Sequence, residues 1–395
     1  MSDSFTCLYC GYEKQHAEAS LEHAIPQFMG GECAPAIFQL TNVCNTCNNN
    51  LGLWVDACYA KSWFITNYMA EAARSLCTKV DDPGLPLRYI GKVDIKDLYM
   101  PNQYISEHWI GPSGETVVWV RPHDERMASY AGGNPIDTRK KESVVYFFPV
   151  SDSEEKFLLG LRSLHRALKK RKVRKILAAK LVDSNGKLVD SEKLGFNSQT
   201  LEDLKNCDVI RNLIREGNLS SKVLVDMKFD QRFRCKLQLG VGYSLFGEDF
   251  LNYTSLDEVQ NGLWPKRSRE NFKIRGASTI SLLLNNNLLG EMVGYPGAVA
   301  IVVLQSGQSW IMSLSIDEKL PFTIELGPSS MNSLYINQEE GYVLLLFPYR
   351  EQVIQLTMAE LIAHRYGYRK HPDLDKIDII RRAAAQFDIQ LLTIP

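Results

Sequence analysis

Residues 7–56 read CLYCGYEKQHAEASLEHAIPQFMGGECAPAIFQLTNVCNTCNNNLGLWVD, and this stretch decides how the N-terminal part of the chain folds. It contains two Cys-x-x-Cys pairs, Cys7 with Cys10 and Cys44 with Cys47, and turn-forming Gly or Asn residues flank them. Four thiolates at about 2.3 Å complete the tetrahedral shell of a zinc ion, and such a closed site is structural. A segment this small buries little apolar surface, so the metal would supply several kcal/mol of its folding free energy. The two pairs therefore predict one structural Zn²⁺.

The composition of the chain bounds its class. Of the nine cysteines in 395 residues, those outside the two pairs occur singly, which is typical of buried cysteines in a reducing compartment. Hydrophobic residues make up 45% and charged residues 23% of the chain, the ordinary proportions of a folded protein with a core. No apolar run approaches the ~20 residues that cross a bilayer, and residues 1–10 lack the basic and apolar segments of a secretion signal. We therefore expect a cytoplasmic protein of two or three domains without a membrane segment.

Between the cysteine pairs, further polar residues and glycines occur in a definite order. Glu22-His23 is followed by Pro26, then by Gly30-Gly31, then by Asn42, and Asn48 directly follows the last cysteine. The ordered set resembles the zinc-knuckle HNH endonucleases, also called ββα-metal or His-Me finger nucleases. Their pattern runs Cys-x-x-Cys, an acidic residue with His and a nearby Pro, Gly-Gly, Asn, and a second Cys-x-x-Cys followed by His or Asn. The likeness covers about residues 7–56 and keeps both order and spacing.

The resemblance implies a ββα-metal site that hydrolyses phosphodiester bonds. His23 would be the general base, Asn42 would orient its imidazole, and Gly30-Gly31 would be the turn of the β-hairpin. Glu22 and the amide oxygen of Asn48 would hold a Mg²⁺ or Mn²⁺ ion. An imidazole of pKa about 6.5 can remove a proton from water at neutral pH, and a hard cation prefers carboxylate and amide oxygens. The ion would stabilise the charge that develops on the scissile phosphate.

Two positions depart from the family pattern. Many members have His where this chain has Asn48, and a further His or Asn where it has Gly52. Asp56 is on the same helical face, but on a regular helix it stands about 12 Å along the axis from Asn48. We therefore expect Asp56 to be an outer or packing group unless the helix breaks at Gly52. The ion would then have few protein ligands, Glu22 and Asn48, with phosphate and water completing its shell.

The remaining chain is typical of a larger α+β region with mostly antiparallel strands, because strands and helices are interspersed without regular βαβ alternation. We predict an HNH domain at residues 1–80, an α+β accessory or recognition region at 81–276, and a mainly antiparallel β region at 277–395 with C-terminal helices. The last two could form one domain. Expected strands include 116–120, 143–150, 223–227, 279–284, 298–304, 310–316, 342–347 and 353–357. Expected helices include 153–180, 203–216, 358–366, 375–387 and a helix in which Phe229, Phe233, Leu237 and Gly240 share a face.

A basic block follows the first long predicted helix and suggests a nucleic-acid contact. It consists of Arg166, Lys169, Lys170, Arg171, Lys172, Arg174 and Lys175. Such a run is either a solvated helix face or a set of phosphate contacts that are independent of base sequence. Further basic residues could extend it, namely Arg232, Arg234, Lys236, Lys266, Arg267, Arg269, Lys273 and Arg275.

The resemblance and the architecture together favour an endonuclease that cuts double-stranded DNA, with the C-terminal region selecting the target. Chains that append such a head to a large unrelated region are often bacterial restriction or anti-phage effectors, which is an argument from architecture alone. Two alternatives stay open: a nucleic-acid-binding zinc module with a degenerate active site, and an RNA-directed nuclease. The sequence leaves the oligomeric state undecided.

Overall fold

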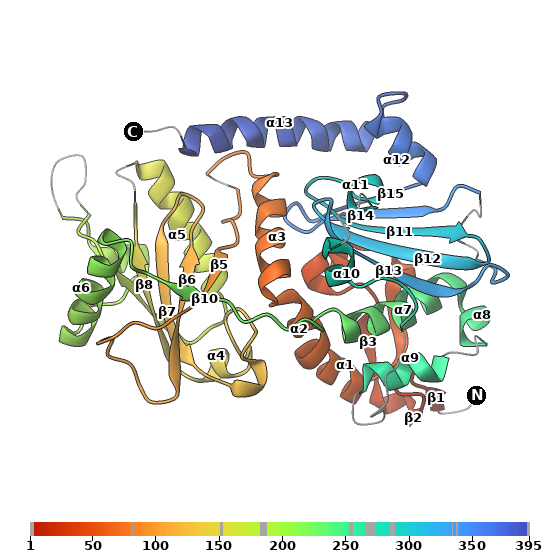
Figure 1. Cartoon of the computed structure of the whole chain (residues 1–395), viewed down its shortest axis with the longest axis horizontal. Helices are drawn as coiled ribbons and strands as arrows, with labels where there is room; N and C mark the ends of the chain where they lie inside the picture. The colour runs from red at the N-terminus through yellow and green to blue at the C-terminus, as the bar shows by residue number, and fades with distance from the viewer. Residues whose placement is uncertain are drawn as a thin grey trace. The chain divides into compact units, whose positions relative to one another are not determined.

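A computed structural model describes residues 4–80, 82–150, 153–181, 188–252, 256–264, 274–284, 289–333, 335–336 and 339–392. The chain forms two compact units (Figure 1). The first consists of residues 1–60, 71–76 and 227–382, and the second of residues 61–70, 77–226 and 383–395. The N-terminal head thus packs in one unit with a C-terminal segment. The domain boundaries predicted near residues 80 and 276 stay predictions, whereas the mixed α+β class is confirmed.

The head begins with a small hairpin and continues with a second one. Strands β1 (Ser4–Thr6) and β2 (Glu13–Gln15) are antiparallel, as are β3 (Ala19–His23) and β4 (Gln39–Cys44). Helix α1 (Asn45–Leu51) starts directly after β4, and a π-helical turn (Gly52–Asp56) and α2 (Ala57–Ala60) continue it. The expected order of two strands and a helix is therefore present between the cysteine pairs and just beyond them.

The connection between β3 and β4 differs from the expected tight hairpin turn. It contains three short 3₁₀ turns, Gln27–Met29, Gly31–Cys33 and Ala36–Phe38, and Gly30 lies between the first two with φ +91°. A Cβ on Gly31 would lie 1.7 Å from the backbone oxygen of Ile25. Gly30 is therefore needed for a left-handed conformation and Gly31 for a close backbone approach. The pair therefore lies in the connection between the two strands, as predicted, although this connection is longer than a single turn.

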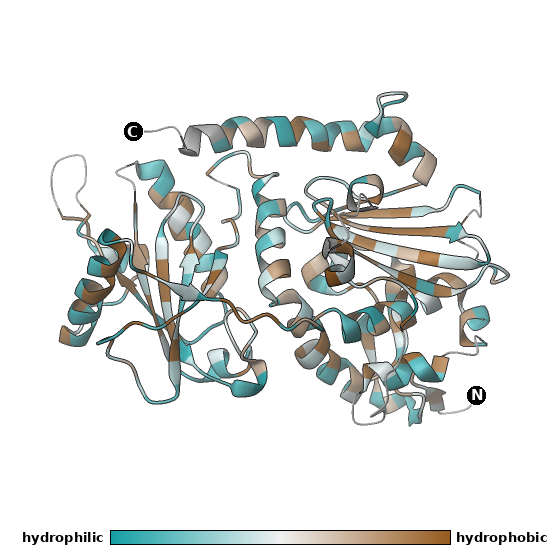
Figure 2. Cartoon of the chain, viewed as in Figure 1, coloured by the Kyte–Doolittle hydropathy of each residue, from teal (hydrophilic) through white to brown (hydrophobic). Residues whose placement is uncertain are grey.

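The C-terminal part of the first unit is built on a five-stranded antiparallel sheet of order β13-β12-β11-β14-β15. Its central strand has Ile301 opposite both Leu314 and Leu344, and all three are fully buried. Figure 2 shows the hydrophobic character of these strands. The strands are β11 (Val299–Ser306), β12 (Ser309–Ile316), β13 (Lys319–Pro328), β14 (Tyr342–Phe347) and β15 (Gln352–Leu356). The antiparallel prediction for this region is confirmed.

Helices come before and after the strands of that sheet in the sequence. They are α7 (Gln231–Phe246), α8 (Glu248–Leu251), α9 (Leu256–Leu263), α10 (Thr279–Leu284), α11 (Leu289–Val293), α12 (Met358–Arg365) and α13 (Pro372–Leu392). The strand expected at 279–284 is wrong, because this segment is α10. Its first N–H is capped by the carboxylate of Asp230 (2.7 Å), and a short leucine-rich run fits either structure by periodicity alone.

The second unit is a six-stranded sheet of order β10-β5-β6-β7-β8-β9, antiparallel except for the parallel pair β8 and β9. Alternate residues of its central strands face opposite ways: Trp119 and Val145 pack with α5 (Glu154–Leu168), while Val118 and Tyr146 pack with α6 (Leu201–Arg215). Helix α3 (Trp63–Arg74) precedes the sheet, and α4 (Asp137–Lys140) precedes β8. The strands are β5 (Arg88–Val93), β6 (Tyr104–Ile110), β7 (Thr116–Pro122), β8 (Ser143–Phe148), β9 (Val173–Leu177) and β10 (Ser221–Lys222).

Two sequence predictions fail in this unit. The helix expected over 153–180 ends at Leu168, and residues 173–177 form β9, because they complete the sheet beside β8. The strand expected over 223–227 is also wrong. Pairing stops at Lys222, and the side chains that follow are exposed, so no core rewards an extended strand there. Among the described residues, no helix is both long and apolar enough to span a membrane.

Candidate metal centre and active site

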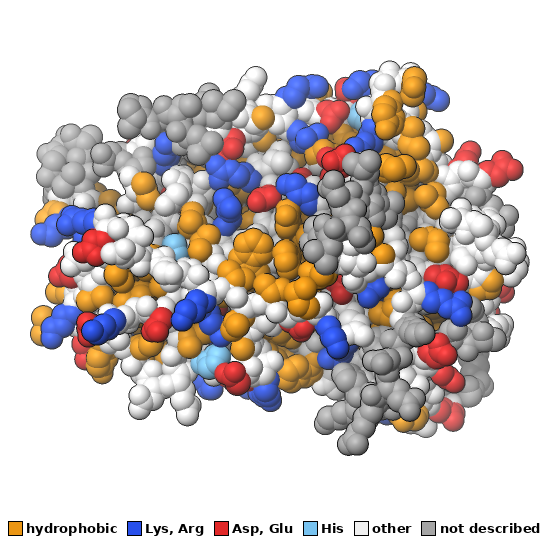
Figure 3. Space-filling model, viewed as in Figure 1, with side chains coloured by type: hydrophobic (Ala, Val, Ile, Leu, Met, Phe, Trp, Pro, Cys, Tyr) orange, Lys and Arg blue, Asp and Glu red, His pale blue; other side chains and the backbone are white. Residues whose placement is uncertain are grey.

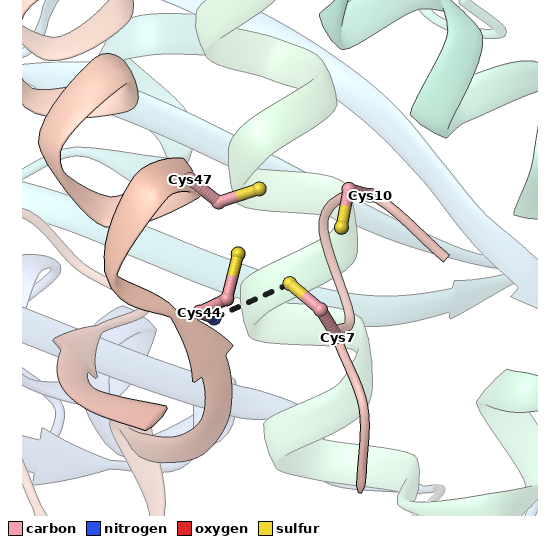
Figure 4. A group of neighbouring side chains, drawn as sticks. All are labelled: Cys7, Cys10, Cys44 and Cys47. Atoms are coloured by element: carbon pink, nitrogen blue, oxygen red, sulfur yellow. Dashed lines mark hydrogen bonds between the residues drawn. The ribbon is translucent and has the colours of Figure 1, made fainter. Parts of the chain in front are cut away.

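The four paired cysteines converge on one point. Their sulfur atoms all lie within 4.8 Å of one another, and all four side chains are buried (Figure 4). Cys7 and Cys10 come from the loop between β1 and β2, whereas Cys44 ends β4 and Cys47 lies in the first turn of α1. Sulfurs in a tetrahedral zinc shell are about 3.8 Å apart, given Zn–S bonds of about 2.3 Å. The donor set and its spacing therefore fit the predicted structural zinc.

The surroundings favour the thiolate, the form that binds zinc, at Cys7, whereas burial raises the pKa of Cys10 and the hydrogen bond with Cys7 raises that of Cys47. A hydrogen bond with Cys47, helped by the backbone N–H of Cys44 at 3.4 Å, lowers the pKa of Cys7 to about 4. Cys44 also caps the start of α1, where the helix dipole favours negative charge. The second knuckle thus combines a ligand position with a helix N-terminus.

The C-terminal part of the first unit holds the first knuckle in place. Gln260 donates a hydrogen bond to the carbonyl of Leu8, and the Trp264 indole donates one to the carbonyl of Tyr9, both at 2.8 Å. Gly11 has φ +70°, and a Cβ there would lie 2.7 Å from the side-chain oxygen of Gln260. These partners are 252 and 255 positions away in the sequence. The zinc knuckle is therefore part of the core of this unit.

His23 and Glu22 point to opposite sides of β3, as the alternation of a strand requires. Glu22 is buried, whereas His23 is partly exposed at the end of the strand, opposite Gln39 of β4. Within the described residues, no side chain or backbone group hydrogen-bonds the His23 imidazole. An accessible imidazole without a fixed partner can accept a proton from a bound water, as a general base must.

Glu22 contacts a residue that the sequence suggested only as an extension of the basic block. Lys236, on α7, places its ammonium group 2.7 Å from Glu22 Oε1 and 2.6 Å from Asp56 Oδ2. Lys236 is 1% exposed, so the three charges form a buried cluster. Burial opposes the charge on Lys236, but Asp56 and Glu22 together raise its pKa. Burial in turn raises the pKa of Glu22, and Lys236 counteracts that effect. Lys236 therefore stays charged and holds the two carboxylates together.

Asp56 reaches this cluster because the helix changes form. Residues Gly52–Asp56 are π-helical, with the N–H of Ala57 bonded to the carbonyl of Gly52. The assumption of a regular helix is therefore wrong over this segment. In the described contacts Asp56 meets Glu22 only through Lys236, and its second oxygen, Oδ1, is buried without a hydrogen-bond partner. The hydroxyl of Tyr9 is likewise buried without a partner, and the charges of Glu22 and Asp56 contribute to its raised pKa.

The two asparagines lie at different places. The side-chain N–H₂ group of Asn48 donates to Ser20 Oγ (3.2 Å) and to the carbonyl of Leu21 (3.1 Å), which leaves its amide oxygen without a partner among the described residues. Asn48 is thus fixed against the peptide that precedes Glu22. Asn42 has a buried side-chain oxygen without a partner, and its backbone carbonyl accepts from Leu8. Gln39, which the sequence reasoning missed, is the residue opposite His23 in the register.

Comparison with known proteins agrees with this geometry. Residues 7–64 match the sequence model of the HNH endonuclease family. The head is an HNH endonuclease domain. Neither the curated proteins nor the solved structures contain a match to the chain. The match covers only the head, so it assigns a nucleic-acid substrate and nuclease chemistry to this domain and leaves the remaining chain without a family.

The HNH domain offers suitable donors for a divalent ion. Glu22 and Asp56 carry two negative charges and Lys236 one positive charge, so the cluster keeps one uncompensated negative charge. Among the described residues, Lys236 contacts one of the two carboxylate oxygens of Glu22, Oε1, and the other oxygen has no partner. The Oδ1 atom of Asp56 is buried and accepts no hydrogen bond from a described residue. Carboxylate oxygens and the free amide oxygen of Asn48 are ligands that Mg²⁺ and Mn²⁺ accept. These residues fit such an ion in charge and in donor type.

The basic block divides into structural and exposed residues. Arg171 lies over the ring of Trp119, 4.8 Å from its centre, and Arg174 pairs with Asp203 at 2.6 Å. Lys169, Lys170 and Lys172 are exposed in the loop between α5 and β9. The block is therefore not one helix face. On the face drawn in Figure 3, basic and acidic side chains are interspersed.

The residues that were suggested to extend this block differ in burial and in their contacts. Arg234 and Lys236 are buried, so the suggestion that they extend a phosphate-binding surface is wrong. Arg232 donates to the carbonyls of Leu263 and Trp54. Arg275 is exposed and 3.4 Å from Glu325. Lys266, Arg267, Arg269 and Lys273 lie outside the described residues.

Proposed function

We propose that the HNH domain hydrolyses phosphodiester bonds in double-stranded DNA with the help of Mg²⁺ or Mn²⁺. The observation that supports this most is the position of His23. It lies at the end of β3 opposite Gln39, partly exposed and on the side of the strand opposite Glu22, whereas the zinc-site residue Cys44 pairs with Ala19 at the other end of the same two strands. In this proposal His23 takes the proton from the attacking water.

The other residues of the site do not react themselves. They hold the ion or orient other side chains. Glu22 and Asn48 would hold the ion, which when bound supplies positive charge to the scissile phosphate. Lys236, which Asp56 also holds, fixes the carboxylate of Glu22 and favours its ionised form in its buried position. Asn42 would orient the imidazole, as the family pattern implies, and Gln39 is a second candidate for that role because it faces His23 across the hairpin.

The exposed lysines of the loop after α5 would add contacts to the DNA backbone. Lys169, Lys170 and Lys172 have no ion-pair partner among the described residues, so phosphates can reach them. Contacts of this kind raise affinity without reading base sequence. Such a chain, with a nuclease head on a large further region, would suit a bacterial restriction or anti-phage effector.

A cleavage assay on four substrates tests the proposal. Plasmid, linear duplex, single-stranded DNA and structured RNA would be incubated with the purified chain, with Mg²⁺, with Mn²⁺ and with EDTA. We expect the ions to support cleavage of both duplex substrates, and EDTA to stop it. Cleavage of RNA alone would favour the RNA-directed alternative. Duplex binding without cleavage under every condition would favour a binding module with a degenerate site.

A further inference from the structure

The second unit contains a pocket of about 270 Å³ that the HNH chemistry does not use. Its floor is the face of the sheet that carries Trp109 and Trp119. Arg166 at the end of α5 and Arg171 in the loop that follows form one side. Lys61, at the start of this unit, completes the wall. The volume is close to the lower end of the range of about 300–1,000 Å³ in which small-molecule sites fall.

The charged groups of this pocket have one sign. Lys61, Arg166 and Arg171 line it, and none of the described lining residues is acidic. The ammonium of Lys61 donates to the carbonyl of Ala131 at 3.0 Å, and that is its only acceptor within the described part of the chain. Glu107 is the carboxylate that acts on it, but Glu107 is already bound by Arg121 and by the backbone N–H of Gly132.

This arrangement is electrostatically unfavourable without a ligand. Burial, and then the guanidinium of Arg171, lower the pKa of Lys61 well below its usual range, and Arg121 and Arg139 add to this effect. Burial also lowers the pKa of Arg171 to about 10. Two cations that share a poorly solvated pocket without an acidic partner destabilise each other. An anion bound between them would relieve that repulsion.

The remaining walls accept a flat, largely apolar group. Trp109 is partly exposed, and Leu87, Val117 and Val145 complete the apolar surface. The indole N–H of Trp119 is buried without an acceptor, although Trp119 is 4% exposed and lines the pocket. Buried indole N–H groups usually find a hydrogen-bond partner, so this one is available to a ligand.

We propose that this pocket binds a mononucleotide, with the phosphate at Lys61 and Arg171 and the base against the tryptophans. The ligand is either a free nucleotide or the terminal nucleotide of a phosphorylated strand, since both present the same phosphate and base. The site belongs to the second unit, so its test does not depend on whether the HNH domain cleaves DNA.

Calorimetric titration of the whole chain tests the ligand class. The probes are the four common 5′-mononucleotides, the matching nucleosides, inorganic phosphate, and a single-stranded oligonucleotide with and without a 5′-phosphate. We expect at least one mononucleotide to bind about tenfold or more tightly than its nucleoside and than phosphate. A preference for the 5′-phosphorylated oligonucleotide over the mononucleotide would identify the strand end as the source. Equal binding of nucleoside and nucleotide, or no binding of any probe, overturns the proposal.

A matched pair of variants tests the role of Lys61. Lys61→Met should weaken mononucleotide binding about tenfold to hundredfold and should raise the melting temperature of the ligand-free chain, because it removes an unpaired charge. Lys205→Met, at an exposed lysine outside the pocket, should change neither quantity. Lys61→Gln serves as a second variant with the same readouts if Lys61→Met does not fold. Unchanged nucleotide affinity in a folded Lys61 variant would contradict the assignment.

Discussion

Lys236 in the first unit and Lys61 in the second are both enclosed by protein, yet their surroundings act on them in opposite directions. Lys236 contacts two carboxylates, which raise its pKa although burial opposes its charge. Lys61 contacts one carbonyl and faces Arg171, and its pKa is lowered. Burial costs both residues solvation, so the partners decide the outcome. The compensated cation is a structural element of the first unit, whereas the uncompensated one supports the proposed ligand site of the second.

The largest expected effect concerns the four-cysteine centre of the first unit. Cys44→Ala removes a zinc ligand at the N-terminus of α1, so the head should lose its fold as well as its metal. Cys235→Ala, at a buried cysteine outside the cluster, is the control and should keep the metal. Elemental analysis should find about one zinc per unaltered chain. Folded, cleaving protein that contains no zinc would contradict a structural role.

Replacing each of the two lysines by methionine tests the comparison between Lys236 and Lys61 directly. Lys236→Met leaves the buried Glu22 and the half-buried Asp56 without a counter-charge, and it should lower the free energy of unfolding by about 3–5 kcal/mol. Lys61→Met should leave that free energy unchanged or raise it, because no carboxylate loses its partner. Urea-induced unfolding of each variant measures the difference. A similar loss of stability in both variants would show that the partners do not distinguish the two sites.

A smaller effect is expected when one carboxylate of the Lys236 cluster is neutralised. Glu22→Gln removes a proposed ligand, and Asp56→Asn lets Lys236 cancel the charge of Glu22, so the net charge rises from minus one to zero in either case. Both variants should need more Mn²⁺ for half-maximal cleavage, and high Mn²⁺ should partly restore their rate. Asn48→Ala should show the same dependence without the change in charge. Wild-type metal dependence in all three would place the ion elsewhere.

The smallest effect is expected from the exposed lysines after α5. Reversing Lys169, Lys170 and Lys172 to Glu should weaken DNA binding and reduce the slope of log K against log salt by about 0.9 per lost phosphate contact. Reversing Lys193, Lys205 and Lys222, which are also exposed, provides a control of equal charge. Equal slopes for the two triple variants would show that the lysines of this loop do not contact phosphates.

The sequence predicted those parts of the site that are held by local spacing. Two Cys-x-x-Cys pairs and an acidic-His pair can be read from neighbouring residues, and the four sulfurs converge as expected. The antiparallel sheet of the first unit was also predictable, because its apolar runs are long and rich in β-branched residues. Helix α10 and strand β9 were not, since short apolar runs fit either structure until the surrounding packing selects one.

Lys236 could not be found in this way. It is 180 positions from Asp56, and it lies on a helix that is buried on nearly all sides, so neither periodicity nor spacing distinguishes it from a surface lysine. The available signal is that Cys235 and Leu237 flank this lysine. The pocket around Lys61 was missed for a similar reason, because its walls come from many separate segments of the second unit.

Cleavage by a His23→Ala variant is the most direct test of the proposed function. The substitution leaves the cysteines and the Lys236 cluster untouched, so zinc content and duplex binding should stay at the level of the unaltered chain. The cleavage rate should fall by about 10²- to 10⁴-fold, the usual scale of lost general-base catalysis, and added Mn²⁺ should not restore it. His16→Ala, at the exposed histidine of the same domain, should cleave normally. A His23→Ala variant that cleaves duplex DNA at the unaltered rate would contradict the assignment of His23 as the base.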